Sequence, residues 1–131
     1  MSDEPRGELT IRVMAMPADT NPDGDVFGGW VMAQMDLAGG IAATNRCLCR
    51  ATTVAVHAMA FIQPVKVGDI LCVHTEVLKV GRTSMHIRIE AWARRSHTQL
   101  RTKVTEAEFI YVALGEDGHP TPVDRGPVDR E

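Results

Sequence analysis

Residues 28–46 read GGWVMAQMDLAGGIAATNR and form the most apolar stretch of this chain. The stretch is too long for one strand, and its Met, Ala, Gln and Leu content favours a helix. Because it is apolar nearly all round, the helix is expected to be buried on most sides. A single carboxylate, Asp36, interrupts it.

Asp36 is the first candidate for a catalytic group. A carboxylate among Met, Leu, Ile and Ala is costly to bury unless something pairs with it or uses it. Enzymes place carboxylates in such surroundings to act as bases or nucleophiles. The alternative is a structural acid bonded to backbone amides or to an arginine across an interface, and the sequence leaves both interpretations open.

The helix begins with two glycines, Gly28 and Gly29. Glycines at a helix start allow close approach and leave backbone N–H groups pointing outward, which suits an oxyanion or a polarised carbonyl. An ordinary tight turn into the helix is the alternative. Asp25, just ahead of this start, is a candidate N-cap.

The spacing between these features predicts a shared site. Eight residues separate Gly28 from Asp36, which is about 12 Å along a helix. Attack on a carbonyl needs heavy atoms about 3–3.5 Å apart. If both features serve one reaction, the carboxylate must come from another copy of the helix. This predicts a dimer with antiparallel helices and a site at the subunit boundary.

The rest of the pattern is β. Alternation predicts a short strand over residues 9–13, and Val-, Ile- and Ala-rich runs predict strands over 52–63, 70–78, 85–92 and 100–114. One helix covered by one antiparallel sheet is an α+β fold. The expected organisation is a flexible arm over 1–8, one domain over 9–120 and a solvated tail over 121–131, where Pro-Val-Asp-Arg occurs twice.

Composition narrows the function classes. The formal net charge is −3, from 14 Lys and Arg against 17 Asp and Glu, so no basic footprint for nucleic acid is visible. Three cysteines without a disulfide framework favour reduced thiols and a cytoplasmic location. No apolar signal core or membrane-spanning run is found. The histidines lack metal-ligand spacing, so a metal is not expected, and without a Walker loop or a dinucleotide fingerprint no cofactor is expected either.

A basic turn is predicted at residues 79–84, where Lys79, Gly81, Arg82, Thr83 and Ser84 combine two cations, two hydroxyls and a glycine. Phosphates favour such clusters through charge-assisted contacts and free amides. The alternative is a solvated hairpin.

Several ordered motifs over about residues 9–120 resemble one family. They are residues 15–21 (AMPADTN), 24–30 (GDVFGGW), 34–36 (QMD), 61–64 (FIQP), 67–69 (VGD), 79–84 (KVGRTS) and 105–109 (TEAEF). Together they resemble the hot-dog-fold acyl-CoA thioesterases of the YciA type, which are related to brain and cytosolic acyl-CoA hydrolases.

The resemblance implies a long central helix wrapped by a five- or six-stranded antiparallel sheet. It also implies homodimers with composite sites, assembled further as trimers of dimers, and hydrolysis of acyl-CoA to free acid and CoA. By motif, Asn21 and Asp36 match the two catalytic positions, and the amides of Gly28 and Gly29 would polarise the thioester carbonyl. The basic turn at 79–84 would hold CoA phosphates, with CoA as part of the substrate and no further cofactor.

Two departures concern acyl preference, because related enzymes often have an acid where this chain has His57 and a polar residue near Ala60. By default His57 is expected to be a satisfied core or interface histidine. Two other functions stay open. A hot-dog dehydratase usually needs a histidine paired with an acid, and only His57 could serve. A non-catalytic acyl-CoA-binding module would leave Asp36 merely structural.

Overall fold

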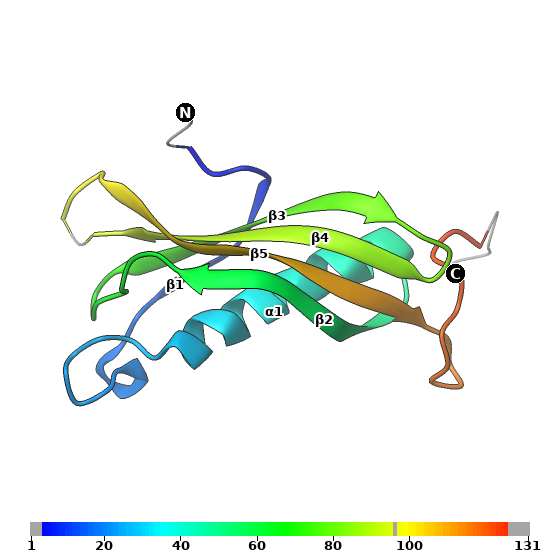
Figure 1. Cartoon of the computed structure of the whole chain (residues 1–131), viewed down its shortest axis with the longest axis horizontal. Coiled ribbons are helices and arrows are strands. Elements are labelled where there is room, and N and C mark those ends of the chain that lie inside the picture. Colours follow the sequence, from blue (N-terminus) through cyan, green and yellow to red (C-terminus); the bar gives the residue numbers. More distant parts are fainter. Residues whose placement is uncertain (1–3, 96, 126–131) are drawn as a thin grey trace.

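The computed structural model describes residues 4–95 and 97–125, and one long helix lying along one sheet dominates it (Figure 1). The helix, α1, spans Gly28–Cys47 and contacts all five strands. The strands are β1 (Glu8–Met14), β2 (Arg50–Phe61), β3 (Ile70–Val80), β4 (Ser84–Arg94) and β5 (Arg101–Leu114), and a 3-10 turn, η1, spans Pro17–Asp19.

The sheet has the order β1-β3-β4-β5-β2, and every neighbouring pair is antiparallel. The expected α+β fold with a five- or six-stranded antiparallel sheet is confirmed, with five strands in the described residues. Strand β2 therefore forms one edge of the sheet, so half of its backbone hydrogen-bonding groups face away from β5.

The core lies between α1 and the inner face of the sheet. On β4, Met85, Ile87 and Ile89 are fully buried and alternate with outward-facing polar residues, as the period of two predicted. Helix and sheet approach each other closely at Gly39. A Cβ there would lie 2.0 Å from the Tyr111 hydroxyl and 2.6 Å from Ile89 Cδ1, which explains a glycine deep in a helix.

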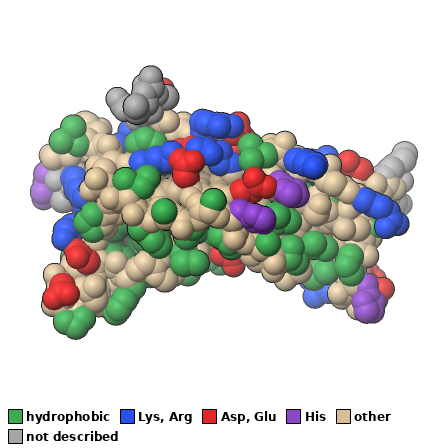
Figure 2. Space-filling view, in the orientation of Figure 1, with side chains coloured by type: hydrophobic (Ala, Val, Ile, Leu, Met, Phe, Trp, Pro, Cys, Tyr) green, Lys and Arg blue, Asp and Glu red, His purple; other side chains and the backbone are tan. Residues whose placement is uncertain are grey.

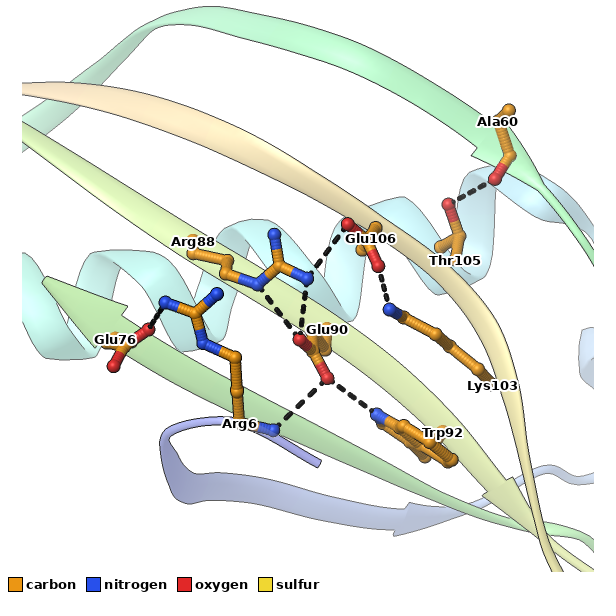
Figure 3. Close-up of polar contacts among 9 residues, drawn as sticks. All are labelled: Arg6, Ala60, Glu76, Arg88, Glu90, Trp92, Lys103, Thr105 and Glu106. Atoms are coloured by element: carbon orange, nitrogen blue, oxygen red, sulfur yellow. Dashed lines mark hydrogen bonds and ion pairs between the residues drawn. The ribbon is translucent and has the colours of Figure 1, made fainter. Parts of the chain in front are cut away.

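The outer face of the sheet carries a polar network centred on Glu90, which is only 2% exposed (Figure 3). Trp92 Nε1 and the backbone N–H of Arg6 donate to Glu90 at 2.9 and 3.2 Å. Arg88 bridges Glu90 and Glu106, each at 2.8 Å. Burial alone would raise the pKa of Glu90, but the hydrogen bonds from Trp92, Arg6 and Arg88 outweigh it and lower that pKa.

The described residues of both predicted chain ends contact the fold. The arm is joined to the sheet at Arg6, which also pairs with Glu76 at 2.6 Å. In the tail, Val123 is 3% exposed and donates its backbone N–H to Arg82, while Arg46 pairs with Asp124 at 2.8 Å. Residues 121–125 thus pack on the fold rather than extending into solvent. The second Pro-Val-Asp-Arg copy lies outside the described residues.

Candidate active site

Asp36 lies in the middle of α1, and its side chain is exposed in the single chain rather than buried as the sequence indicated. The reason is that its helix face is itself uncovered. Met32, Leu37 and Ile41 on that face are 39%, 59% and 44% exposed. Asp36 does lie among apolar side chains, but the sheet of its own chain does not cover them.

Two side chains hold one oxygen of the Asp36 carboxylate. Thr53 Oγ1 donates to Oδ1 at 2.5 Å, and the Tyr111 hydroxyl lies 3.0 Å from the same oxygen. The Tyr111 hydroxyl also lies 2.9 Å from the backbone oxygen of Asp36. This arrangement fixes Oδ1 and leaves Oδ2 as the oxygen available to a ligand.

Thr53 and Tyr111 are functional candidates that sequence reasoning missed. They are directly paired across β2 and β5, and both face α1. The available signal was a hydroxyl at an inward-facing position of each strand, but strand pairing must be known before the two can be placed together.

Tyr111 is 1% exposed, and its pKa is raised well above the ordinary tyrosine value. Burial is the largest cause, followed by the negative charge of Asp36 and the hydrogen bond to it. The hydroxyl therefore stays protonated at neutral and moderately alkaline pH, so that it can serve as a donor to Asp36 throughout that range.

A pocket of about 440 Å³ opens beside Asp36. It is lined by Asp36, Leu37, Gly40, Ile41, Thr44, Asn45, Ala51, Thr53 and Tyr111. No histidine is among these residues. His57 lies on β2 with its side chain exposed, in the register position opposite Glu108 and not in this pocket. In the single chain His57 is therefore not a core residue, and its expected alternative place at an interface stays a prediction.

The start of α1 matches the prediction except for its cap. Phe27 occupies the N-cap position without a side-chain cap, whereas Asp25 forms an ion pair with Lys66 instead. In the described part of the chain, the amides of Gly28 and Gly29 have no hydrogen-bond acceptor. A second, mostly apolar pocket of about 400 Å³ lies beside Gly28.

Asn21 shapes the loop that leads to α1. Its side-chain Oδ1 accepts the backbone N–H groups of Asp23 and Asp25, at 3.0 and 3.1 Å. Its own N–H donates to the backbone oxygen of Asp25 at 2.7 Å. These bonds hold Asn21 in the loop that leads into α1, seven residues before Gly28 in the chain.

The basic turn at residues 79–84 joins β3 to β4. Gly81 donates its N–H to Ser84 at 2.8 Å, and the side chains of Lys79 and Arg82 are exposed. Figure 1 places this turn and the start of α1 toward opposite ends of the long axis of the molecule. One chain therefore does not bring the predicted site residues together.

Hydrophobic side chains remain uncovered on α1 and β2. Figure 2 shows them along the α1 and β2 side of the molecule, whereas charged side chains gather over β3 and β4. On β2, Val54, Val56 and Phe61 are 56%, 41% and 47% exposed. Contiguous apolar surface of this kind indicates an interface.

Residues 4–95 and 97–125 contain neither a cluster of metal ligands nor a membrane-spanning helix. No three or more His, Cys, Asp or Glu side chains come together there as metal ligands. Over the same residues, no helix combines the length and hydropathy needed to cross a bilayer.

Known proteins resemble this chain over most of its length. A family model described as the thioesterase superfamily matches residues 23–99. The acyl-CoA thioester hydrolase YciA of Salmonella typhimurium is 48% identical over 126 residues, covering 94% of this chain and 95% of that protein.

Solved structures agree with this. The hexameric thioesterase y2039 from Yersinia pestis superposes with a TM-score of 0.88 and 45% identity, covering 91% of this chain and 98% of that one. A hexameric hotdog fold thioesterase of Campylobacter jejuni gives a TM-score of 0.83 and 39% identity, covering 88% and 90% of the two chains.

Proposed function

This chain belongs to the thioesterase superfamily, and on that premise we propose that it hydrolyses acyl-CoA thioesters to a free carboxylic acid and CoA, with Asp36 as the essential carboxylate. The hot-dog fold, the YciA relatives and the thioesterase structures all support this reaction. The observation that carries the role of Asp36 is its geometry, with one oxygen held by Thr53 and Tyr111 beside an apolar pocket.

Asp36 acts on the thioester carbonyl in one of two ways. As a general base it takes a proton from water as the water attacks the carbonyl; the C–S bond then breaks, and the departing CoA thiolate takes up the proton. As a nucleophile it attacks through Oδ2, the C–S bond breaks so that CoA leaves as a thiolate, and the mixed anhydride that remains is then hydrolysed by water. Hydroxylamine separates the two, because it converts an anhydride at Asp36 to a hydroxamate that peptide mass spectrometry detects, whereas a general base stays unmodified.

The site is completed by a second copy of the chain. About 12 Å of helix separates Gly28 from Asp36, so the amides that polarise the carbonyl belong to one subunit and the carboxylate to the other. The exposed apolar face of α1 and the open edge of β2 are the surfaces that a second copy would cover. Asn21 lies in the loop that leads to these amides and would position water or carbonyl at the site.

The proposal for the full oligomer of this chain rests on its relatives. The Yersinia pestis and Campylobacter jejuni thioesterases are described as hexameric. We place the homodimer as the smallest active unit of this chain and a trimer of dimers as its full assembly. Lys79, Gly81, Arg82, Thr83 and Ser84 would hold the CoA phosphates.

Release of free CoA thiol from a panel of acyl-CoAs of different chain lengths tests the reaction. We expect turnover, with no metal or cofactor added, and loss of turnover on removal of Asp36. CoA binding without thiol release would favour the non-catalytic binding module. Hydration of an enoyl-CoA would favour the dehydratase, for which only His57 could serve. The cytoplasmic location and the lack of nucleic-acid binding stay predictions.

A further inference from the structure

Cys47 and Cys49 bring two thiols together at the junction of α1 and β2, apart from the Asp36 pocket. Cys47 is the last residue of α1, and Cys49 precedes β2 by one residue. The Sγ atoms lie 2.7 Å apart. A disulfide bond is about 2.05 Å long, so the two sulfurs need to approach by well under one ångström to form one. We call this feature the Cys47–Cys49 pair.

The backbone between the two cysteines produces this convergence. Leu48 caps α1 in the left-handed conformation, with φ 55° and ψ 41°, and donates its N–H to Thr44 at 2.8 Å. A leucine rarely adopts this conformation. Here it turns the chain back on itself, so that the side chain of Cys49 returns to that of Cys47.

The two thiols differ in accessibility. Cys47 is 1% exposed, and burial together with the hydrogen bond from Cys49 raises its pKa to about 11. Cys49 is half-buried and lines a pocket of about 480 Å³ with Arg50, Arg125 and others. A small oxidant therefore reaches Cys49 first, and Cys47 is placed directly behind it.

We propose that the Cys47–Cys49 pair is a redox-active dithiol, which a hydroperoxide such as hydrogen peroxide oxidises to an intramolecular disulfide. The Cys49 sulfur attacks the peroxide, the O–O bond breaks, and a sulfenic acid forms with release of water. The Cys47 sulfur then attacks the Cys49 sulfur. The S–O bond breaks, and the departing hydroxide takes the Cys47 proton as a second water. The two sulfurs lose two electrons, which the peroxide gains.

The disulfide would act in redox chemistry and would add little to the stability of the fold. It closes a loop of only three residues, and the stabilisation that a disulfide provides through the unfolded chain grows with loop length. Cys72 provides an internal control, because it is a buried free thiol on β3, outside the pair.

The sequence allows the oxidation of this pair to be tested on one tryptic peptide. Arg46 and Arg50 flank the pair, so trypsin releases Cys47 and Cys49 together on the peptide Cys47-Leu48-Cys49-Arg50. The full-length reduced protein is treated with hydrogen peroxide, denatured, alkylated and measured by intact and peptide mass. We expect the number of alkylated cysteines to fall from three to one, and the peptide to lose two hydrogens. Dithiothreitol should reverse both changes.

Cysteine-to-serine variants show which part each thiol takes in the oxidation. Cys72→Ser should leave the oxidation unchanged. Cys47→Ser should trap the sulfenic acid on Cys49, seen as a dimedone adduct that the unsubstituted chain does not accumulate. If Cys47→Ser fails to fold by circular dichroism, Cys49→Ser serves instead, and both of its remaining thiols should stay alkylatable. The proposal is overturned if all three thiols survive peroxide, if disulfides join separate copies, or if Cys49 is oxidised to a sulfinic acid while Cys47 remains a thiol.

Discussion

The hydroxyl of Tyr111, a residue of β5, lies 3.0 Å from the carboxylate Oδ1 and 2.9 Å from the backbone oxygen of Asp36, in the middle of α1. A hydroxyl has one proton to share between these two acceptors. The contact therefore joins the candidate catalytic carboxylate to the sheet at both its side chain and its backbone, and Thr53 adds a second donor to the same oxygen.

Removing the carboxylate should abolish hydrolysis. We expect Asp36→Ala to lower kcat about 10²- to 10⁴-fold, because a positioned base or nucleophile contributes on that scale. Free-thiol release measures the loss, and size-exclusion chromatography checks that the oligomer remains. Asp23→Ala, which removes an exposed acid from the loop before α1, is the matched control. Near-normal turnover by Asp36→Ala would eliminate the mechanism.

Removing the Tyr111 hydroxyl should weaken turnover through Asp36. A hydrogen bond to a charged group contributes about 1.5–3 kcal/mol, so Tyr111→Phe should lower kcat roughly ten- to hundred-fold. A double variant with Asp36→Ala tests the route. If Tyr111 acts by holding Asp36, the double variant is no slower than Asp36→Ala alone. A further drop in the double variant would show an independent role.

The amide of Gly28 should act as a carbonyl-polarising donor. Gly28 is the first residue of α1, where proline fits a helix but supplies no N–H. Gly28→Pro should lower kcat about 10²- to 10³-fold, as loss of one oxyanion donor does. Gly28→Ala is the control, because it keeps the N–H. Both substitutions add a Cβ, which at this position would lie 3.3 Å from the Phe61 ring. Equal loss in both variants would indicate packing rather than donation.

A composite site predicts complementation between inactive variants. Co-expression of Asp36→Ala with Gly28→Pro should place both defects at one site of a mixed dimer and leave the other site intact. With random pairing, about a quarter of the normal activity should return. Failure of the mixture to exceed either parent would mean that each site takes its Asp36 and its Gly28 from the same chain.

Tyr111 should titrate abnormally late. It is the only tyrosine in the chain, so absorbance at 295 nm reports its ionisation alone. Because burial and the Asp36 charge raise its pKa, no tyrosinate should form in the folded protein at pH 11, whereas the denatured chain should titrate near its ordinary value of about 10. The folded state holds the proton more tightly, so this contribution to stability is present below about pH 10 and is lost as the pH rises beyond it. If the folded and the denatured protein formed tyrosinate at the same pH, the raised pKa of Tyr111 would be refuted.

Substituting alanine for each of two adjacent glycines should change the free energy of unfolding in opposite directions. Gly39→Ala places a Cβ against the Tyr111 hydroxyl and Ile89, and should cost about 1–3 kcal/mol of unfolding free energy. Gly40→Ala meets no atom within 4 Å in the chain and should gain up to about 1 kcal/mol from helix propensity. Denaturant unfolding measures both, with the oligomeric state checked by light scattering. Equal effects would contradict a close approach at Gly39.

The sequence alone determined the elements and the family. The run over residues 28–46 and the alternation over 85–92 predicted α1 and β4 because helix and strand periodicities are local properties of the chain. The ordered motifs around Asn21 and Asp36 predicted the thioesterase family, which the comparisons show.

Only the tertiary structure decided what surrounds Asp36. Thr53 and Tyr111 reach its carboxylate because β2 pairs with β5 at one edge of the sheet, and no local pattern encodes which strands pair. The exposure of Asp36 likewise depends on which helix face the sheet covers. The approach of Cys49 to Cys47 depends on the left-handed backbone of Leu48, which side-chain periodicity does not reveal.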